Sequence, residues 1–75
     1  MEENTAWPHN DLKKIKNVDT VEACREECKQ VEGATHFTWR GPDSKPKRKR
    51  NSCFCKDKVG TPETTTDVYS GLTEC

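Results

Sequence analysis

The chain has 75 residues, of which 29% are hydrophobic and 35% are charged, and its acidic and basic side chains balance to a net charge of zero. This length accommodates one domain, which buries only roughly 60% of the surface that the unfolded chain exposes. The composition excludes a large apolar core, so another constraint must help to hold the fold. The five cysteines supply it, because cysteines in so short a chain indicate disulfides and an oxidising compartment.

The chain shows neither a membrane span nor a signal peptide. No apolar run reaches the roughly 20 residues that a membrane-spanning helix needs, so direct membrane insertion is not expected. The first four residues are polar and acidic, and no apolar stretch follows them. Together with a disulfide framework, this predicts a fragment of a longer secreted protein, in which Met1 is an added start.

The first elements in chain order are a short extended segment and a helix. Residues 1–18 begin as a polar stretch with Trp7 as the first anchor, and they continue as an extended or turn-like piece. Residues 19–33 have the strongest helical pattern, with Asp19 as N-cap, Glu22 in a capping-box position and Gly33 as the C-terminal stop. One face of this helix carries Val21, Cys24, Cys28 and Val31.

The rest of the chain has the pattern of strands joined by loops. Residues 34–40 alternate threonine and aromatic side chains with others, which predicts a strand with Phe37 and Trp39 on one face and His36 on the other. Residues 52–56 form a second strand, paired with the first in a hairpin. The connecting segment 41–50 and the segment 60–66 are predicted loops, and 68–70 form a last strand that ends at Gly71.

Four of the cysteines have spacings that match between helix and strand. Cys24 and Cys28 lie four residues apart, about 6 Å along one helix face. Cys53 and Cys55 lie two residues apart, roughly 6.8 Å along one strand face. A helix lying on the sheet can therefore form two adjacent bridges to one strand. This favours Cys24–Cys53 and Cys28–Cys55, although the spacing does not exclude the swapped pairing, and it leaves Cys75 as a free thiol.

A zinc site is the main alternative use of these four cysteines. The usual zinc knuckle is C-x2-C in a turn, whereas here one pair lies on a helix and the other is C-x-C in a strand. We therefore expect disulfides, with no metal and no cofactor. We also expect no enzyme, because His9 and His36 belong to no catalytic constellation and Cys75 has no histidine near it in the sequence.

Several motifs follow one another along the chain: E-A-C-R-E-E-C at 22–28, F-T-W at 37–39, C-F-C-K at 53–56, Y-S-G at 69–71, and a final Cys75. In order, spacing and flanking residues they resemble the apple/PAN module, and more narrowly the apple repeats of apicomplexan microneme adhesins. The resemblance implies an α+β fold with one α-helix packed on a curved antiparallel β-sheet. It also implies that residues 1–75 are one apple/PAN-like domain, a repeat of an adhesin that passes through the secretory pathway to the microneme.

Two departures from the family pattern concern cysteines. Ala34 stands where the family has a cysteine, whose usual partner is the second helical cysteine, here Cys28. Cys55 stands where the family has an aliphatic residue, so the resemblance implies a rewired Cys28–Cys55 bridge. The family's N-terminal cysteine, which would pair with Cys75, is also absent.

The charges are unevenly distributed and include one basic loop. Residues 40–58 carry eight basic side chains against two acidic ones. The loop at 45–50 has three interpretations: a solvated loop, a site for sulfated or sialylated glycans, or a contact with a protein partner. A run of lysine and arginine is also typical of nucleic-acid binding and nuclear targeting, but the disulfide framework argues against a nuclear protein, so no nucleic acid is expected.

A neutral-sugar site would need an aromatic face and a few fixed polar groups. Trp7, Trp39 and Tyr69 are the available platforms, although Trp39 belongs to the F-T-W motif and is expected in the core. Taken with the basic loop, the carbohydrate-binding candidates are His36, Arg40, Lys45, Lys47, Arg48, Lys49, Arg50 and Tyr69.

The predicted function is that of an extracellular lectin-like module in host-cell attachment. Apple/PAN modules bind proteins, carbohydrates or glycosaminoglycans and are not catalysts, so the resemblance implies a host-cell-surface glycan or glycoprotein as partner, of galactose type or anionic. The alternative is a protein–protein interaction module that assembles the subunits of an adhesive complex. A glycan array distinguishes the two functions.

Overall fold

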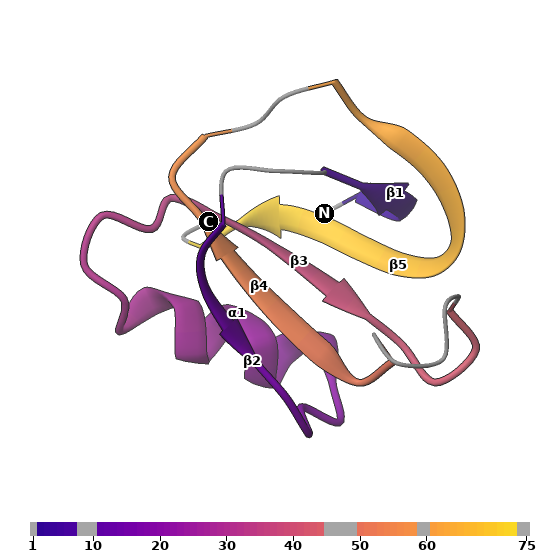
Figure 1. Cartoon of the computed structure of the whole chain (residues 1–75), viewed down its shortest axis with the longest axis horizontal. Helices are drawn as coiled ribbons and strands as arrows, with labels where there is room; N and C mark the ends of the chain where they lie inside the picture. Colours follow the sequence, from indigo (N-terminus) through magenta and orange to yellow (C-terminus); the bar gives the residue numbers. More distant parts are fainter. Residues whose placement is uncertain (1, 8–10, 45–49, 59–60, 74–75) are drawn as a thin grey trace.

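The computed structural model describes residues 2–7, 11–44, 50–58 and 61–73, and these form one helix and five strands. The elements are β1 (Glu2–Ala6), β2 (Asp11–Ile15), α1 (Val21–Lys29), β3 (His36–Arg40), β4 (Ser52–Lys56) and β5 (Glu63–Leu72). All neighbouring strands are antiparallel, in the order β1-β5-β3-β4-β2 (Figure 1). The expected α+β class, with one helix packed on an antiparallel sheet, is confirmed. No helix in this part of the chain is long and apolar enough to cross a membrane.

Two disulfides join α1 to β4. Cys24 bonds to Cys53 and Cys28 bonds to Cys55, with Cα–Cα distances of 5.3 and 5.2 Å. These are the pairs that the helix and strand spacings favoured, and the swapped pairing does not occur. Cys75, expected as a free thiol, lies outside the described residues.

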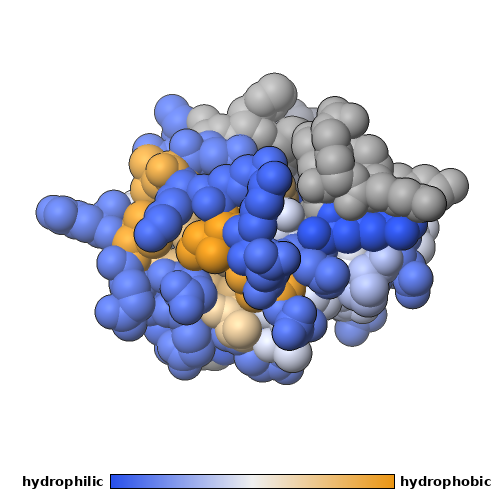
Figure 2. All heavy atoms as spheres, turned by 60° about the horizontal axis from the view of Figure 1, so that its bottom comes forward, coloured by the Kyte–Doolittle hydropathy of each residue, from blue (hydrophilic) through white to orange (hydrophobic). Residues whose placement is uncertain are grey.

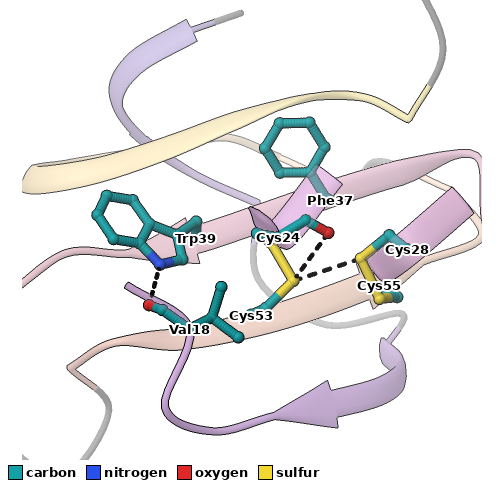
Figure 3. Packing of buried hydrophobic residues seen from close by; sticks show 7 residues of the cluster. All are labelled: Val18, Cys24, Cys28, Phe37, Trp39, Cys53 and Cys55. Carbon is teal, nitrogen blue, oxygen red and sulfur yellow. Dashed lines mark hydrogen bonds between the residues drawn. A yellow bond between two sulfur atoms is a disulfide. The ribbon is translucent and has the colours of Figure 1, made fainter. Parts of the chain in front are cut away.

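The core between α1 and the sheet is built around these sulfur atoms. Phe37 and Trp39 point toward the helix from β3 and are almost fully buried. The indole Nε1 of Trp39 donates a hydrogen bond of 2.8 Å to the carbonyl of Val18, just before the helix (Figure 3). The buried cluster consists of Val18, Cys24, Cys28, Phe37, Trp39, Cys53 and Cys55.

The helix is shorter than predicted. Its N-cap is Thr20 and not Asp19, because the Thr20 hydroxyl accepts a hydrogen bond of 3.1 Å from the backbone N–H of Ala23. Its last residue is Lys29, four positions before Gly33. Beyond it the hydrogen bonds shorten to i→i+3 turns, and Gly33 adopts a φ of 87° in the connection that leads to β3.

The largest differences from prediction lie at the two ends of the chain. β1 and β2 both form within residues 1–18, and β5 begins at Glu63, inside a predicted loop, and continues past Gly71. β5 pairs with β1 and with β3, and it bends where Asp67 adopts a left-handed φ of 57° (Figure 1). Asn4 adopts a similar φ of 52°, and its side chain accepts a hydrogen bond from the Asp67 N–H. Asn and Asp tolerate this region better than most residues.

The distal face is our name for the sheet surface turned away from α1. Because side chains alternate along a strand, it carries His36, Thr38 and Arg40 from β3 and Phe54 and Lys56 from β4. The Thr38 hydroxyl lies 2.8 Å from that of Ser70, which donates to the carbonyl of Thr5 in β1. β1 therefore helps to cover this face, so both faces of the central strands are buried.

Candidate ligand-binding surfaces

A cluster of charges lies on the distal face. Lys56 is 2% exposed and its Nζ pairs with the carboxylate of Asp11 in β2. Burial lowers the pKa of Arg40, and the nearby carboxylates of Glu63 and Asp11 act in the opposite direction. Lys56 is therefore paired with Asp11, and the partly buried Arg40 lies in the electrostatic field of Glu63 and Asp11. The Lys56–Asp11 pair ties β2 to β4, and the charged side chains of this face do not present an open positive surface.

His36 lies at the end of the same face. Its Nδ1 is 2.7 Å from the hydroxyl of Thr35, and its ring meets the buried indole of Trp7 edge-on, with centroids 5.4 Å apart. His36 and Arg40 are four residues apart on one strand, which separates them by roughly 13 Å. A single sugar ring does not span that distance.

A small hollow of about 280 Å³ opens beside Thr35, just before β3. Its lining residues are Ala34, Thr35, Leu72 and Thr73, from the connection before β3 and the end of β5. The Thr73 N–H donates to the Thr35 carbonyl at 3.0 Å, which fixes the two segments against each other. The hollow is slightly below the usual range for small-molecule sites, roughly 300–1,000 Å³, and none of the described residues that line it is aromatic. It suits one small group, such as a methyl-bearing side chain or one sugar ring.

The basic loop starts and ends on a fixed base. The buried Ser44 donates from its hydroxyl to the carbonyl of Gly41 at 2.9 Å, and Arg50 Nε donates to the carbonyl of Ser44 at 2.6 Å. Asp67 holds the first turn through its backbone carbonyl, 2.8 Å from the Gly41 N–H, and through its carboxylate, 2.9 Å from the Asp43 N–H. These hydrogen bonds of Ser44, Asp67 and Arg50 hold the two ends of the basic loop, and we call them the loop clamp. Lys45, Lys47, Arg48 and Lys49 lie outside the described residues.

The remaining candidate, Tyr69, lies on the opposite side of the sheet. Its ring stacks on Trp39 at a centroid distance of 5.8 Å and a tilt of 30°, within the helix-side layer. Partial burial, followed by the carboxylate of Asp67, raises the pKa of Tyr69. Tyr69 therefore does not share a surface with His36 and Arg40, and the candidates form no single neutral-sugar site.

Sequence reasoning did not single out Lys56, Asp11 and the loop clamp. The alternation C-F-C-K could have indicated Lys56, because the two cysteines face the helix and the lysine must then face away. Nothing local indicated that Asp11 would pair with it, since that contact depends on the register of β2 against β4.

The helix side of the molecule is mostly hydrophilic. Figure 2 shows charged and polar side chains over most of this side, with apolar patches between them. Leu12 is exposed next to Gly33, and Ile15, Val21 and Val31 are partly buried against the core. Interrupted patches of this kind are normal on a small protein and indicate no particular partner.

Comparison of the sequence with models of known protein families and with curated proteins gives no match.

Proposed function

We propose that the chain is a non-catalytic, extracellular binding module of the apple/PAN type, one repeat of a secreted adhesin, and that it recognises anionic carbohydrate on a host-cell surface. The two disulfides and the single helix packed on an antiparallel sheet support the comparison with that module. The sequence motifs at 22–28, 37–39 and 53–56 support it further.

The proposal of an anionic ligand rests on one observation: hydrogen bonds fix both ends of the basic loop. Residues 45–49, Lys-Pro-Lys-Arg-Lys, carry four positive charges in five residues. They leave from Ser44, which is fully buried, and return to Arg50, which is hydrogen-bonded to the Ser44 carbonyl. Fixing both ends of a loop lowers the entropy that is lost when the loop orders on a ligand. Clustered lysine and arginine side chains attract sulfate and carboxylate groups, and arginine binds them with paired hydrogen bonds.

The cations of the distal face differ from those of the basic loop, and this difference favours the loop as the anion-binding surface. Arg40 and Lys56 already lie near the carboxylates of Glu63 and Asp11, so their charge is largely compensated within the protein. The loop at 45–50 contains no acidic residue. The segment that connects β3 and β4 therefore carries the densest run of basic residues in the sequence.

The test compares two triple variants that each remove three positive charges. The loop variant is Lys47→Ala/Arg48→Ala/Lys49→Ala, and the matched control is Lys13→Ala/Lys16→Ala/Lys58→Ala, whose lysines are exposed elsewhere on the protein. We expect the loop variant to bind immobilised heparin oligosaccharide at least about 10-fold more weakly and with a smaller salt dependence, because surface charges act through a screened field. Equal losses in both variants would refute a specific loop site.

The second candidate function is binding of a protein partner, and the exposed leucine at the hollow favours it. Leu72 is 59% exposed at the edge of a hollow that accommodates one side chain. Binding of neutral galactose-type sugars without salt dependence would show that the glycan site does not include the basic loop. An array of sulfated, sialylated and neutral glycans that shows no binding at high protein concentration rules out the lectin function and leaves the protein-binding one.

A further inference from the structure

The two disulfides are packed against each other so that four sulfur atoms form one buried cluster. We call Cys24, Cys28, Cys53 and Cys55 the sulfur cluster; each of them is 0% exposed. The Sγ atoms of Cys28 and Cys53 belong to different bridges and are only 3.4 Å apart (Figure 3). The Sγ atoms of Cys24, Cys28 and Cys53 all lie within 4.8 Å of one another.

This spacing is close to that of a tetrathiolate metal site. In tetrahedral zinc coordination a Zn–S bond of about 2.3 Å places the sulfur atoms about 3.8 Å apart. The contact between Cys28 and Cys53 is already 3.4 Å, and the third sulfur lies within the same small volume. When the S–S bonds are broken, rotation of the cysteine side chains can bring the bonded pairs to the same separation.

In the folded chain the four cysteines come from two elements of regular structure. α1 contributes two cysteines one turn apart, and β4 contributes two cysteines on one strand face. Three of these sulfur atoms, from Cys24, Cys28 and Cys53, already lie together, and Cys55 is bonded to Cys28 beside them, so rotation of its side chain would bring the fourth thiol to the same point. The sequence lacks the C-x2-C knuckle, which brings two zinc ligands together by local spacing. Here the fold brings the cysteines together instead.

We propose that the reduced chain binds one zinc ion through Cys24, Cys28, Cys53 and Cys55, and that the ion then replaces the disulfides in holding α1 against β4. A dithiol reductant converts each disulfide into two thiols and is itself oxidised to a cyclic disulfide. Zinc binds the four thiolates, and four protons are released to solvent. Zinc binding is therefore weaker at lower pH, and folding of the reduced chain is linked to the metal.

The experiment uses the full chain with Cys75→Ser, which removes the fifth thiol. The protein is reduced, freed of reductant without air, and titrated with Co²⁺ as a spectroscopic substitute for Zn²⁺. We expect the ligand-field bands of tetrahedral cobalt and the sulfur-to-metal charge-transfer absorption to saturate at one equivalent and to disappear when Zn²⁺ is added. Far-UV circular dichroism should show α1 forming with the metal. The oxidised protein is the control and should give no such spectrum.

Single substitutions identify the ligands. Cys55→Ser should weaken Co²⁺ and Zn²⁺ binding by at least about 100-fold. Loss of a residue that only supports a ligand costs up to about 100-fold, so a larger loss identifies Cys55 as a ligand. The chain with its native Cys75 should bind as tightly as Cys75→Ser. Four results overturn the proposal: no charge-transfer absorption at one equivalent, one metal shared by two chains, a spectrum unchanged by Cys55→Ser, or metal bound without recovery of helical structure.

Discussion

Removing one disulfide is predicted to cost less stability than its own loop suggests, because the other disulfide keeps nearly the same loop closed. The bridges Cys24–Cys53 and Cys28–Cys55 span 29 and 27 residues, and the two loops overlap over residues 28–53. In the chain-entropy model a single bridge closing such a loop contributes about 3.6 kcal/mol to the free energy of unfolding. Once one bridge exists, the second closes a ring of only about six residues and contributes about 2.2 kcal/mol.

The measurement compares two double variants with the quadruple variant. Cys24→Ala/Cys53→Ala and Cys28→Ala/Cys55→Ala should each lower the free energy of unfolding by about 2.2 kcal/mol, plus a packing cost for the lost sulfur atoms. The quadruple variant should lose about 5.8 kcal/mol plus both packing costs. The packing costs cancel in the difference, so the loss in the quadruple variant should exceed the sum of the losses in the two double variants by about 1.4 kcal/mol.

Guanidinium unfolding followed by the fluorescence of the buried Trp7 and Trp39 provides the assay, with Cys75→Ser throughout and a stabilising osmolyte in every solution to keep the weakest variant folded. A quadruple variant that loses no more than the sum of the two double variants refutes the reasoning from overlapping loops. The same conclusion follows if each double variant alone loses more than about 3.6 kcal/mol beyond its packing cost.

Three further predictions concern single residues. Thr20→Ala should lower the free energy of unfolding by about 1 kcal/mol, whereas Asp19→Ala should have little effect, since Thr20 caps the helix; urea midpoints measure both. Gly41→Ala would place a Cβ 2.3 Å from the Asp67 carboxylate and should cost about 1–3 kcal/mol, and Asp67→Ala should reduce that cost in the double variant. Burial and Asp67 raise the pKa of Tyr69 above its unfolded value near 10, so the stability present below that value is lost as pH rises through the folded pKa. Tyr69→Phe should therefore flatten the alkaline fall of the melting temperature, and an unchanged slope would contradict the assignment.

The part of the fold that could be predicted from the sequence is the part fixed by short-range spacing. β4 has the predicted bounds 52–56, because two cysteines with period-2 spacing alternate with Ser52, Phe54 and Lys56. The observed disulfide pairs are those that the similar reach of a helical turn and two strand residues favoured, although that spacing did not exclude the swapped pairing. The choice between Asp19 and Thr20 as N-cap was not predictable in the same way, since both residue types are good caps and stand side by side.

The parts that could not be predicted depend on pairing between distant segments. β1 at the start of the chain forms because it pairs with β5 more than 55 residues later, and its own sequence is polar. The bend in β5 requires Asp67 in the left-handed region, where the side chain of Asn4 caps its N–H. For the candidate site, alternation predicted the sheet face of His36. The placement of Tyr69 opposite Trp39 depended on the register between β3 and β5.

The burial of both sheet faces limits where a ligand can bind. α1 and the sulfur cluster cover one face, and β1, Trp7 and the bent start of β5 lie against the other. The charged residues of the distal face are used internally, as the burial of Lys56 against Asp11 shows. Among the described residues the surfaces left for recognition are therefore loop ends and edges. These are the hollow beside Thr35 and the clamped base from which the basic loop leaves the hairpin, and connecting segments on a rigid scaffold are where binding residues most often occur.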